Sequence, residues 1–275
     1  MIEKNPENSH DKGIIQALLD QLKNELGDSL LNVRVEDIRI GLAYTGVKLT
    51  GGYGGVACTP TYDIFENPVC PVCPVLHNSG KIAGITATEG LQLSLSDNML
   101  DAAVGVAVIN AVSQMAFELR PEKYIFSSVD VLDLIRSDDK VSMIGYFKPL
   151  IPRILKKTGN FLVVEKKEVF DESVRIVPED MSPTVLPGSD IIIISGSTLV
   201  NKTIDDLLKY KGNARDVVLL GPTASMVPQP LFEKGVTAVM GVRINNADKM
   251  LKIVSEAGGT KDLHAICAEK KSFSR

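Results

Sequence analysis

Two cysteines and a histidine lie close together in the N-terminal half of the chain. Cys70 and Cys73 are separated by two residues, and His77 follows four positions later. Thiolate and imidazole groups bind zinc and other transition metals, and a two-residue spacer lets both sulfurs face one ion. A complete structural zinc site needs four protein ligands, for which Cys58 is one further candidate. Metal binding by Cys70, Cys73 and His77 therefore remains a hypothesis beside the favoured interpretation, an ordinary loop with free thiols.

A second group of polar residues follows the apolar runs of the C-terminal half. In an open parallel sheet the carboxyl ends of the strands share one edge, and ligands bind there. Small residues let backbone N–H groups approach a ligand, and an arginine can hold a carboxylate or phosphate with two hydrogen bonds. Gly, Ser, Thr and Pro also form ordinary turns, but four such loops on one edge favour a ligand site. The predicted ligand-binding residues here are Gly145, Tyr146, Phe147, Ser195, Ser197, Thr198, Asn201, Thr203, Gly221, Pro222, Thr223, Ser225 and Arg243.

Glu165 and Asn110 complete the set of candidates. Glu165 ends the second apolar run of the C-terminal half, where an acidic residue can hold the ribose of a nucleotide-like cofactor. The alternative is a solvated strand end beside two lysines. Asn110 stands alone on an apolar helix, where a buried amide must be hydrogen-bonded. It either orients a neighbouring loop or projects into a cleft between domains, and we include it among the ligand-binding residues.

Motifs that would identify a reaction are missing from the sequence. No Gly-x-Gly-x-x-Gly sequence follows the first strand of the C-terminal half, and no Walker sequence occurs. We find no Ser–His–Asp order with supporting motifs, no His-Glu-x-x-His and no identifiable pair of catalytic carboxylates. The catalytic residues are therefore unassigned, and whether the protein is an enzyme stays open.

The elements that position these residues differ between the two halves. In the C-terminal half, apolar β-branched runs alternate with helix-like segments, which is typical of a doubly wound parallel sheet. The runs are 141–146, 161–165, 191–195, 217–221 and 236–241, and the helical segments are 149–158, 203–210, 228–234 and 246–257. Gly258 and Gly259 are expected to close the last helix. Residues 269–275 are polar, and we expect them to be frayed.

The N-terminal half has an α+β pattern. An amphipathic helix is expected over 11–26, antiparallel strands over 33–59, and a long apolar helix from Asn98, which is a good N-cap. Ser137 to Lys140 form a polar linker. The sequence therefore predicts an α+β domain over 1–137 and a parallel α/β domain over 138–275.

Composition excludes several classes of protein. The chain has 275 residues, 30 basic and 34 acidic side chains, and a formal net charge of -4, which argues against nucleic acid as a partner. The N-terminus lacks the apolar core of a signal peptide, and the apolar stretch 102–117 is too short and too polar to span a bilayer. The four cysteines then suggest a reducing compartment, so we expect a cytoplasmic protein without membrane contact. A homodimer is expected on general frequency alone.

The combined motifs resemble a family of prokaryotic proteins described as putative heavy-metal chelators. The segments that carry the resemblance are 105–111, 143–147, 194–203, 221–223 and 241–243. The resemblance covers nearly the whole chain, and it implies an N-terminal domain similar to the capping domain of enolase, followed by a Rossmann-like domain. It also implies a site between the domains and a role in metal chelation or in corrinoid- or siderophore-related metabolism.

Three functions follow as hypotheses. The first is binding of a small anionic ligand, a heavy metal or a metal chelate, in the cleft between the domains. Because hydroxyl and amide groups are poor ligands for soft metals, a chelate is favoured over a bare ion. The second is a transferase or lyase that uses a nucleotide-like or S-adenosylmethionine-like cofactor. The third is a noncatalytic carrier or regulatory module.

Overall fold

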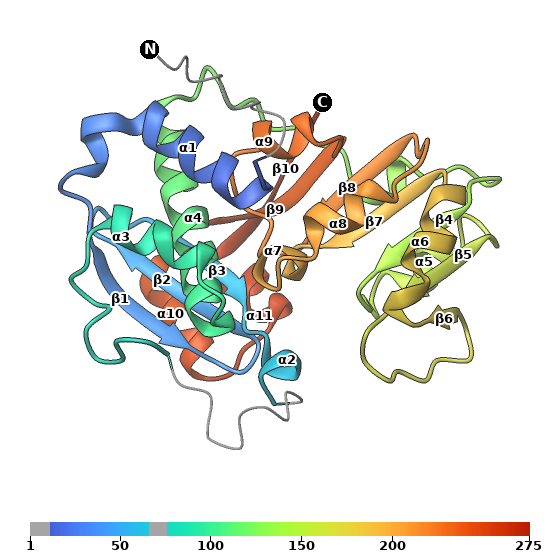
Figure 1. Cartoon of the computed structure of the whole chain (residues 1–275), viewed down its shortest axis with the longest axis horizontal. Helices are drawn as coiled ribbons and strands as arrows, with labels where there is room; N and C mark the ends of the chain where they lie inside the picture. The colour runs from blue at the N-terminus through green and yellow to red at the C-terminus, as the bar shows by residue number, and fades with distance from the viewer. Residues whose placement is uncertain (1–11, 66–75) are drawn as a thin grey trace, which may run out of the picture.

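The computed structural model describes residues 12–65 and 76–275 and contains two sheets. The N-terminal part holds three antiparallel strands in the order β1-β2-β3, with helices packed against them (Figure 1). Its elements are α1 (Ile14–Leu26), η2 (Gly27–Leu30), β1 (Val35–Ile40), β2 (Tyr44–Leu49), β3 (Gly54–Cys58), α2 (Thr61–Phe65), α3 (Ala87–Gln92), η3 (Leu93–Leu95) and α4 (Met99–Leu119). The predicted α+β pattern is confirmed.

Helix α4 lies at the centre of the N-terminal part and starts where the sequence predicts. The Asn98 side chain accepts hydrogen bonds from the N–H groups of Leu100 (2.9 Å) and Asp101 (3.2 Å). Small residues bring its neighbours close: a Cβ on Gly105 would lie 1.9 Å from Ser94 N, and a Cβ on Gly55 of β3 would lie 2.1 Å from the α4 backbone. Helix α4 is long and apolar enough to cross a membrane, but 94% of its apolar window is buried inside the protein, as expected of a core helix.

The C-terminal part is a seven-stranded sheet in the order β10-β9-β8-β7-β4-β5-β6, parallel except for β10. The chain runs from β4 outward to β6, returns to the other side of β4 and continues outward through β9. The direction of winding therefore reverses between β4 and β7, which is the topological switch point of such sheets. The strands are β4 (Val141–Ile144), β5 (Phe161–Val164), β6 (Arg175–Val177), β7 (Ile191–Ser195), β8 (Asp216–Leu220), β9 (Ala238–Ile244) and β10 (Ala268–Ser274).

Short helices connect these strands, and apolar side chains pack on both faces of the sheet. Along β7, Ile192 and Ile194 join one buried cluster, whereas Ile191 and Ile193 join another, as the two-residue period of a strand requires. The predicted strands buried on both faces are confirmed. The helical elements are α5 (Ile151–Leu155), η5 (Glu179–Met181), α6 (Ser182–Val185), η6 (Leu186–Gly188), α7 (Ser197–Val200), α8 (Ile204–Lys209), α9 (Gln229–Glu233), α10 (Ala247–Ser255) and α11 (Thr260–Ile266).

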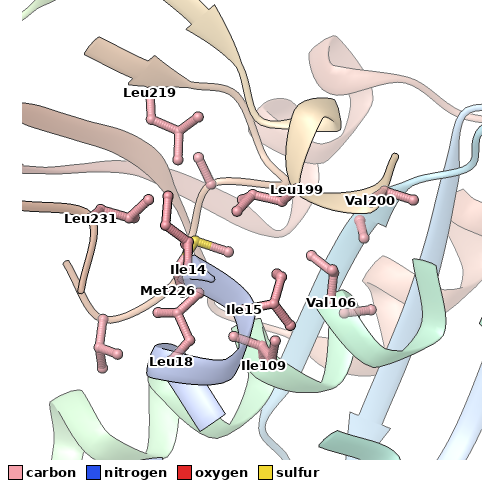
Figure 2. Packing of buried hydrophobic residues seen from close by; sticks show 14 of the residues in the cluster. Ile14, Ile15, Leu18, Val106, Ile109, Leu199, Val200, Leu219, Met226 and Leu231 are labelled. Atoms are coloured by element: carbon pink, nitrogen blue, oxygen red, sulfur yellow. The ribbon is translucent and has the colours of Figure 1, made fainter. Parts of the chain in front are cut away.

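The largest apolar cluster draws on both parts of the chain. Figure 2 shows Ile14 and Leu18 of α1 and Ile109 of α4 packed with Met226 and Leu231 from the C-terminal part. All five side chains are fully buried, and burying each such side chain stabilises the fold by about 1.5–3 kcal/mol. Helix α1 and the loops after β8 therefore share one core.

Helix α10 is late in the chain but packs on the N-terminal sheet (Figure 1). A Cβ on Gly46 of β2 would lie 2.7 Å from Met250 Sδ, and a Cβ on Gly41 would lie 2.1 Å from Val254 O. Glycine is therefore required at Gly41, where the close atom belongs to the backbone, whereas at Gly46 the side chains of α10 would have to shift. The predicted domain boundary near residue 137 is not tested by these contacts and stays a prediction.

Three local expectations differ from the structure. The polar C-terminus is not frayed but forms β10, which pairs with β9 over Ala268–Ser274 and buries Ser272 and Phe273, while Glu269 and Lys270 are exposed. Gly258 does not provide the left-handed residue after α10; Ala257 does, with φ 58°, and α11 follows as the last helix.

The predicted linker also has a structural role. Asp139 is buried, and its carboxylate accepts hydrogen bonds from Arg215 Nη1 (2.9 Å) and Nη2 (2.8 Å). This bidentate pair, together with the Arg136 N–H, holds the pKa of Asp139 below its usual value. The segment before β4 is thereby fixed to the segment that leads into β8. A further strand, β6, is too short and too polar for the apolar pattern to predict.

Candidate functional site: the strand-end pocket

The carboxyl ends of β4 and β7 meet at the switch point. Gly145 follows β4 with φ 92°, and a Cβ at this position would lie 2.9 Å from Ser195 Cβ. Only glycine combines this conformation with so close an approach. Ser195 Oγ lies 2.8 Å from Ser197 Oγ, so the two hydroxyls share one hydrogen bond and one of their protons remains for a ligand.

Several hydrogen bonds tie the loop after β8 to the N-terminal part. Asn110 of α4 is fully buried, and its Nδ2 donates to Val56 O of β3 (2.8 Å) and to Thr223 O (2.9 Å). The Cys58 N–H donates to Thr223 Oγ1 at 2.9 Å. Of the two roles considered for Asn110, the contacts are those of an amide that positions a loop.

These contacts surround a pocket with a volume of about 300 Å³, which we call the strand-end pocket. One wall comes from the end of β3 and from α2, and the other from the ends of β4, β5, β7 and β8. The lining residues are Tyr44, Cys58 to Asp63, Ile144 to Phe147, Val164 to Lys167, Glu179, Ser195 to Thr198, Val200, Asn201 and Leu220 to Thr223.

Backbone N–H groups of the glycines are not free to bind a ligand. Gly145 N donates to Val164 O, Gly196 N to Leu220 O and Gly221 N to Met240 O, each at 2.9 Å. These hydrogen bonds extend the sheet past the ends of the strands. The N–H groups of these three glycines are therefore not available to a ligand, contrary to the role that the sequence suggested for the glycine backbone.

Charged side chains line the outer part of the pocket. The Glu165 carboxylate accepts hydrogen bonds from the N–H groups of Tyr146 (2.7 Å), Lys166 (2.9 Å) and Lys167 (3.0 Å). Lys166 forms an ion pair with Asp63 of α2. The amines of Lys166 and Lys167 lie 5.9 and 5.3 Å from the centre of the Tyr62 ring, a cation–π arrangement.

Cys58, Tyr44 and Tyr146, which also line the pocket, are neutral at pH 7. Burial raises the pKa of the Cys58 thiol, and burial raises that of Tyr44 to about 12. The hydroxyl of Tyr146 donates to Asp171 Oδ2 at 2.7 Å, and this hydrogen bond raises the pKa of the tyrosine.

Both parts of the chain match known protein families. Residues 129–273 match a family model described as "putative heavy-metal chelation", and residues 23–113 match a second model with the same description. An uncharacterised protein of Methanocaldococcus jannaschii is 30% identical over 247 residues, which cover 86% of this chain and 89% of the relative. The chain belongs to the putative heavy-metal chelation family.

Two solved structures of proteins of unknown function share the fold of this chain. The structure from Desulfitobacterium hafniense has a TM-score of 0.74 and 22% identity, covering 95% of this chain and 98% of that chain. The structure from Pyrococcus horikoshii has a TM-score of 0.77 and 24% identity, covering 95% and 100%. The predicted fold class is therefore confirmed.

Several predicted ligand-binding residues lie outside the lining of the strand-end pocket. Arg243 lies instead in a polar pocket of about 240 Å³ with Gln114, Glu118 and Tyr53. Ser225 is buried and structural: its hydroxyl donates to Pro222 O and accepts from Val242 N. Thr203 does not line the pocket, and its hydroxyl donates to Asn201 Oδ1 at 2.9 Å. Strand β9 continues to Ile244, so Arg243 stays within the strand rather than in a loop beyond it.

The predicted cysteine site is only partly within the described residues. Cys70 and Cys73 lie outside them. His77 Nδ1 is 2.6 Å from Asp101 Oδ2, which leaves Nε2 as the ring nitrogen available to a metal. Within 12–65 and 76–275, no three His, Cys, Asp or Glu side chains are grouped so that they could hold an ion.

The sequence did not single out several residues that line the pocket. Pro60 to Asp63, Lys166, Lys167 and Glu179 all line it. The sequence held only a weak clue to these residues: Cys58 to Thr61 come at the end of a predicted strand, and no clear element is predicted after them. Only the packing of β3 beside α4 places Pro60 to Asp63 opposite the carboxyl ends of the parallel strands.

Proposed function

We propose that this protein binds a heavy metal as a complex with a small anionic organic chelator, in the strand-end pocket. The observation that carries the proposal is the position of the pocket at the switch point between β4 and β7, where open α/β sheets bind ligands. The description of the family supplies the metal theme.

The donor groups of the pocket favour a complex over a bare ion. Cys58 is the soft donor in the described lining, and burial raises the pKa of its thiol, which disfavours the thiolate that metals bind. The Ser and Thr hydroxyls are poor ligands for soft metals. A heavy metal would therefore enter with its own ligands.

Positive charge is available for the anionic groups of a chelator. The charge of Asp63 is balanced by Lys166, and three N–H groups already solvate the Glu165 carboxylate. Lys167 has the ring of Tyr62 beside it and no carboxylate partner among the described residues. Glu179 adds a carboxylate that suits the cationic centre of a complex rather than its anionic rim.

Calorimetric titration tests the proposal with Ni²⁺–EDTA, free Ni²⁺ and free EDTA as probes. We expect the anionic complex to bind more tightly than either component. Lys167→Ala should weaken its binding by about fivefold, the effect of losing one exposed charge contact. Lys156→Ala, an exposed lysine outside the pocket lining, serves as the matched control. Binding of free Ni²⁺ that exceeds binding of the complex, with no change in Lys167→Ala, would contradict the proposal.

Mass spectrometry of the protein under native conditions gives a second readout. A metal complex that copurifies with the wild-type protein, and is lost from Lys167→Ala, would identify the natural ligand. A bare metal adduct that Lys167→Ala leaves unchanged would contradict the proposed site.

A nucleotide-like or S-adenosylmethionine-like cofactor has less support from the contacts. Glu165 lines the pocket, as that function requires, but its carboxylate already accepts three backbone N–H groups. The nitrogen atoms of the glycines are engaged in the sheet. Titration with S-adenosylmethionine distinguishes this function, because Glu165→Gln should then weaken binding more than Lys167→Ala.

A further inference from the structure

A second pocket, of about 420 Å³, lies behind the strand-end pocket on the other face of the sheet. Its volume falls within the range of about 300–1,000 Å³ that is usual for small-molecule sites. Its lining residues are Ser127, Ser128, Asp130, Val131, Phe147, Pro149, Leu150, Arg153, Leu220 to Pro222, Met240 to Val242, Thr260, His264 and Lys270 to Ser272.

The pocket exists because this face of the sheet has little helical cover. The buried cluster on this face takes its non-strand members from α5, from the segment 131–135 and from Val174. Helix α5 has five residues and spans only about 7.5 Å, whereas strands in a sheet lie about 4.8 Å apart. A helix this short covers only part of a seven-stranded sheet, and Thr260 and His264 of α11, which packs on β10, also line the pocket.

The floor of the second pocket is apolar. Met240 and Val242 are two residues apart on β9 and therefore point to the same face. They pair in register with Ser272 and Lys270 of β10. Leu220 and Phe147 complete an apolar surface that suits a ring or a short acyl chain.

The rim of the pocket is basic. Arg153, Lys270 and Lys271 line it against a single acidic residue, Asp130. Lys270 and Lys271 have carboxylate neighbours, Asp130 at 3.8 Å and Glu269 at 3.2 Å. The guanidinium of Arg153 forms no ion pair or hydrogen bond with the described residues, so it is available to hold a carboxylate, sulfonate or phosphate.

Phe147 separates the second pocket from the strand-end pocket. Its ring lies 3.8 Å from the position that a Cβ would take on Gly145 and 3.9 Å from that on Gly221. The ring therefore stands between the two glycines, and Leu220, Gly221 and Pro222 belong to the lining of both pockets. Two ligands can bind side by side without sharing a cavity.

We propose that the second pocket binds an amphiphilic organic anion, with its apolar body on Leu220, Met240 and Val242 and its charged group at Arg153. This inference does not depend on the function proposed for the strand-end pocket.

A pair of fluorescent dyes tests both parts of the proposal. The anionic dye 8-anilinonaphthalene-1-sulfonate and the neutral N-phenyl-1-naphthylamine share their ring systems and differ in the sulfonate. We expect the wild-type protein to bind the anionic dye more tightly. Arg153→Ala should weaken anionic dye binding by about fivefold and leave the neutral dye unchanged. Lys157→Ala, which removes an exposed charge near the end of α5, is the matched control and should change neither dye.

A blocking variant tests whether the dye occupies this pocket. Ser128 is exposed at the pocket wall, so Ser128→Trp fills space without disturbing the core, and it should reduce binding of both dyes. An unchanged denaturation midpoint shows that the variant is folded. Lys167→Ala should leave dye binding intact, which separates this inference from the proposal for the strand-end pocket. Equal effects of Arg153→Ala and Lys157→Ala would overturn the role of Arg153, and undiminished dye binding in Ser128→Trp would overturn the location.

Discussion

The strand-end pocket and the second pocket adjoin the same wall but differ in chemistry. The first is lined by hydroxyls and by both signs of charge, whereas the second has an apolar floor with a basic rim. The first needs both parts of the chain, because α2 and the end of β3 form one of its walls. The second is formed almost wholly by residues after 126. One sheet edge therefore borders two pockets of different chemistry. The chain segments that pack beside the edge decide the chemistry of each pocket.

Breaking the link between the two parts should have the largest effect. Asn110→Ala removes the amide that donates to Val56 O and Thr223 O, and it leaves these buried acceptors without a donor. We expect the free energy of unfolding to fall by about 3 kcal/mol, measured by urea denaturation. Ser113→Ala, which removes one longer hydrogen bond to Val227 N from the same helix, should cost less. Equal losses of unfolding free energy in the two variants would contradict a larger contribution from the hydrogen bonds of Asn110.

Gly145 should be the next most sensitive position, because it shapes the strand-end pocket. Gly145→Ala forces a side chain into a left-handed conformation and toward Ser195, so we expect a loss of about 2 kcal/mol in urea denaturation. Gly159 has open space around its Cβ position, and Gly159→Ala should change stability by less than about 0.5 kcal/mol. If Gly145→Ala were as stable as Gly159→Ala, the expected backbone strain at position 145 would be contradicted.

The pair of Asp139 and Arg215 lies at the opposite edge of the sheet and should affect stability without affecting either pocket. Asp139→Asn should lower the free energy of unfolding at pH 7 by about 1–2 kcal/mol. The lowered pKa of folded Asp139 means that its contribution is full above the unfolded value of about 3.9 and is lost as the pH falls through the folded value. The stabilities of the two proteins should therefore begin to converge near pH 4 and become equal only below the folded pKa of Asp139. A difference that persists in acid, or altered binding of the dyes or of Ni²⁺–EDTA, would contradict this assignment.

The smallest expected effect comes from a contact between the two pockets. The Tyr44 hydroxyl lies 2.6 Å from Thr260 Oγ1, and these residues line the strand-end and second pockets respectively. Tyr44→Phe should cost about 1 kcal/mol in thermal or urea denaturation and leave dye binding unchanged. Tyr210→Phe removes a hydroxyl that has no hydrogen bond within the described structure, and it should be neutral. A neutral Tyr44→Phe would show that this contact does not connect the pockets.

The patterns that predicted the fold correctly were those with a local cause. The two-residue alternation of β1 and β2, the apolar runs of β4 and β7, and the Asn98 cap of α4 each report a conformation set by nearby residues. The C-terminal strand β10 was missed because its lysines are polar, and its pairing partner, β9, lies in a different segment. A strand stabilised by a partner has no need of a strong pattern of its own.

The sequence by itself determined the class of each half and predicted several residues that line the strand-end pocket, such as Ser195 and Thr223. Alternating strands and helices indicate parallel strands, and this places the carboxyl ends of β4 to β9 together. Only the tertiary structure decided that Lys167 and Asp63 face the same pocket, that Arg243 does not, and that Asn110 holds a loop. These outcomes depend on how β3 and α4 pack against the loop after β8. Such packing joins residues more than a hundred positions apart, for which local sequence carries no signal.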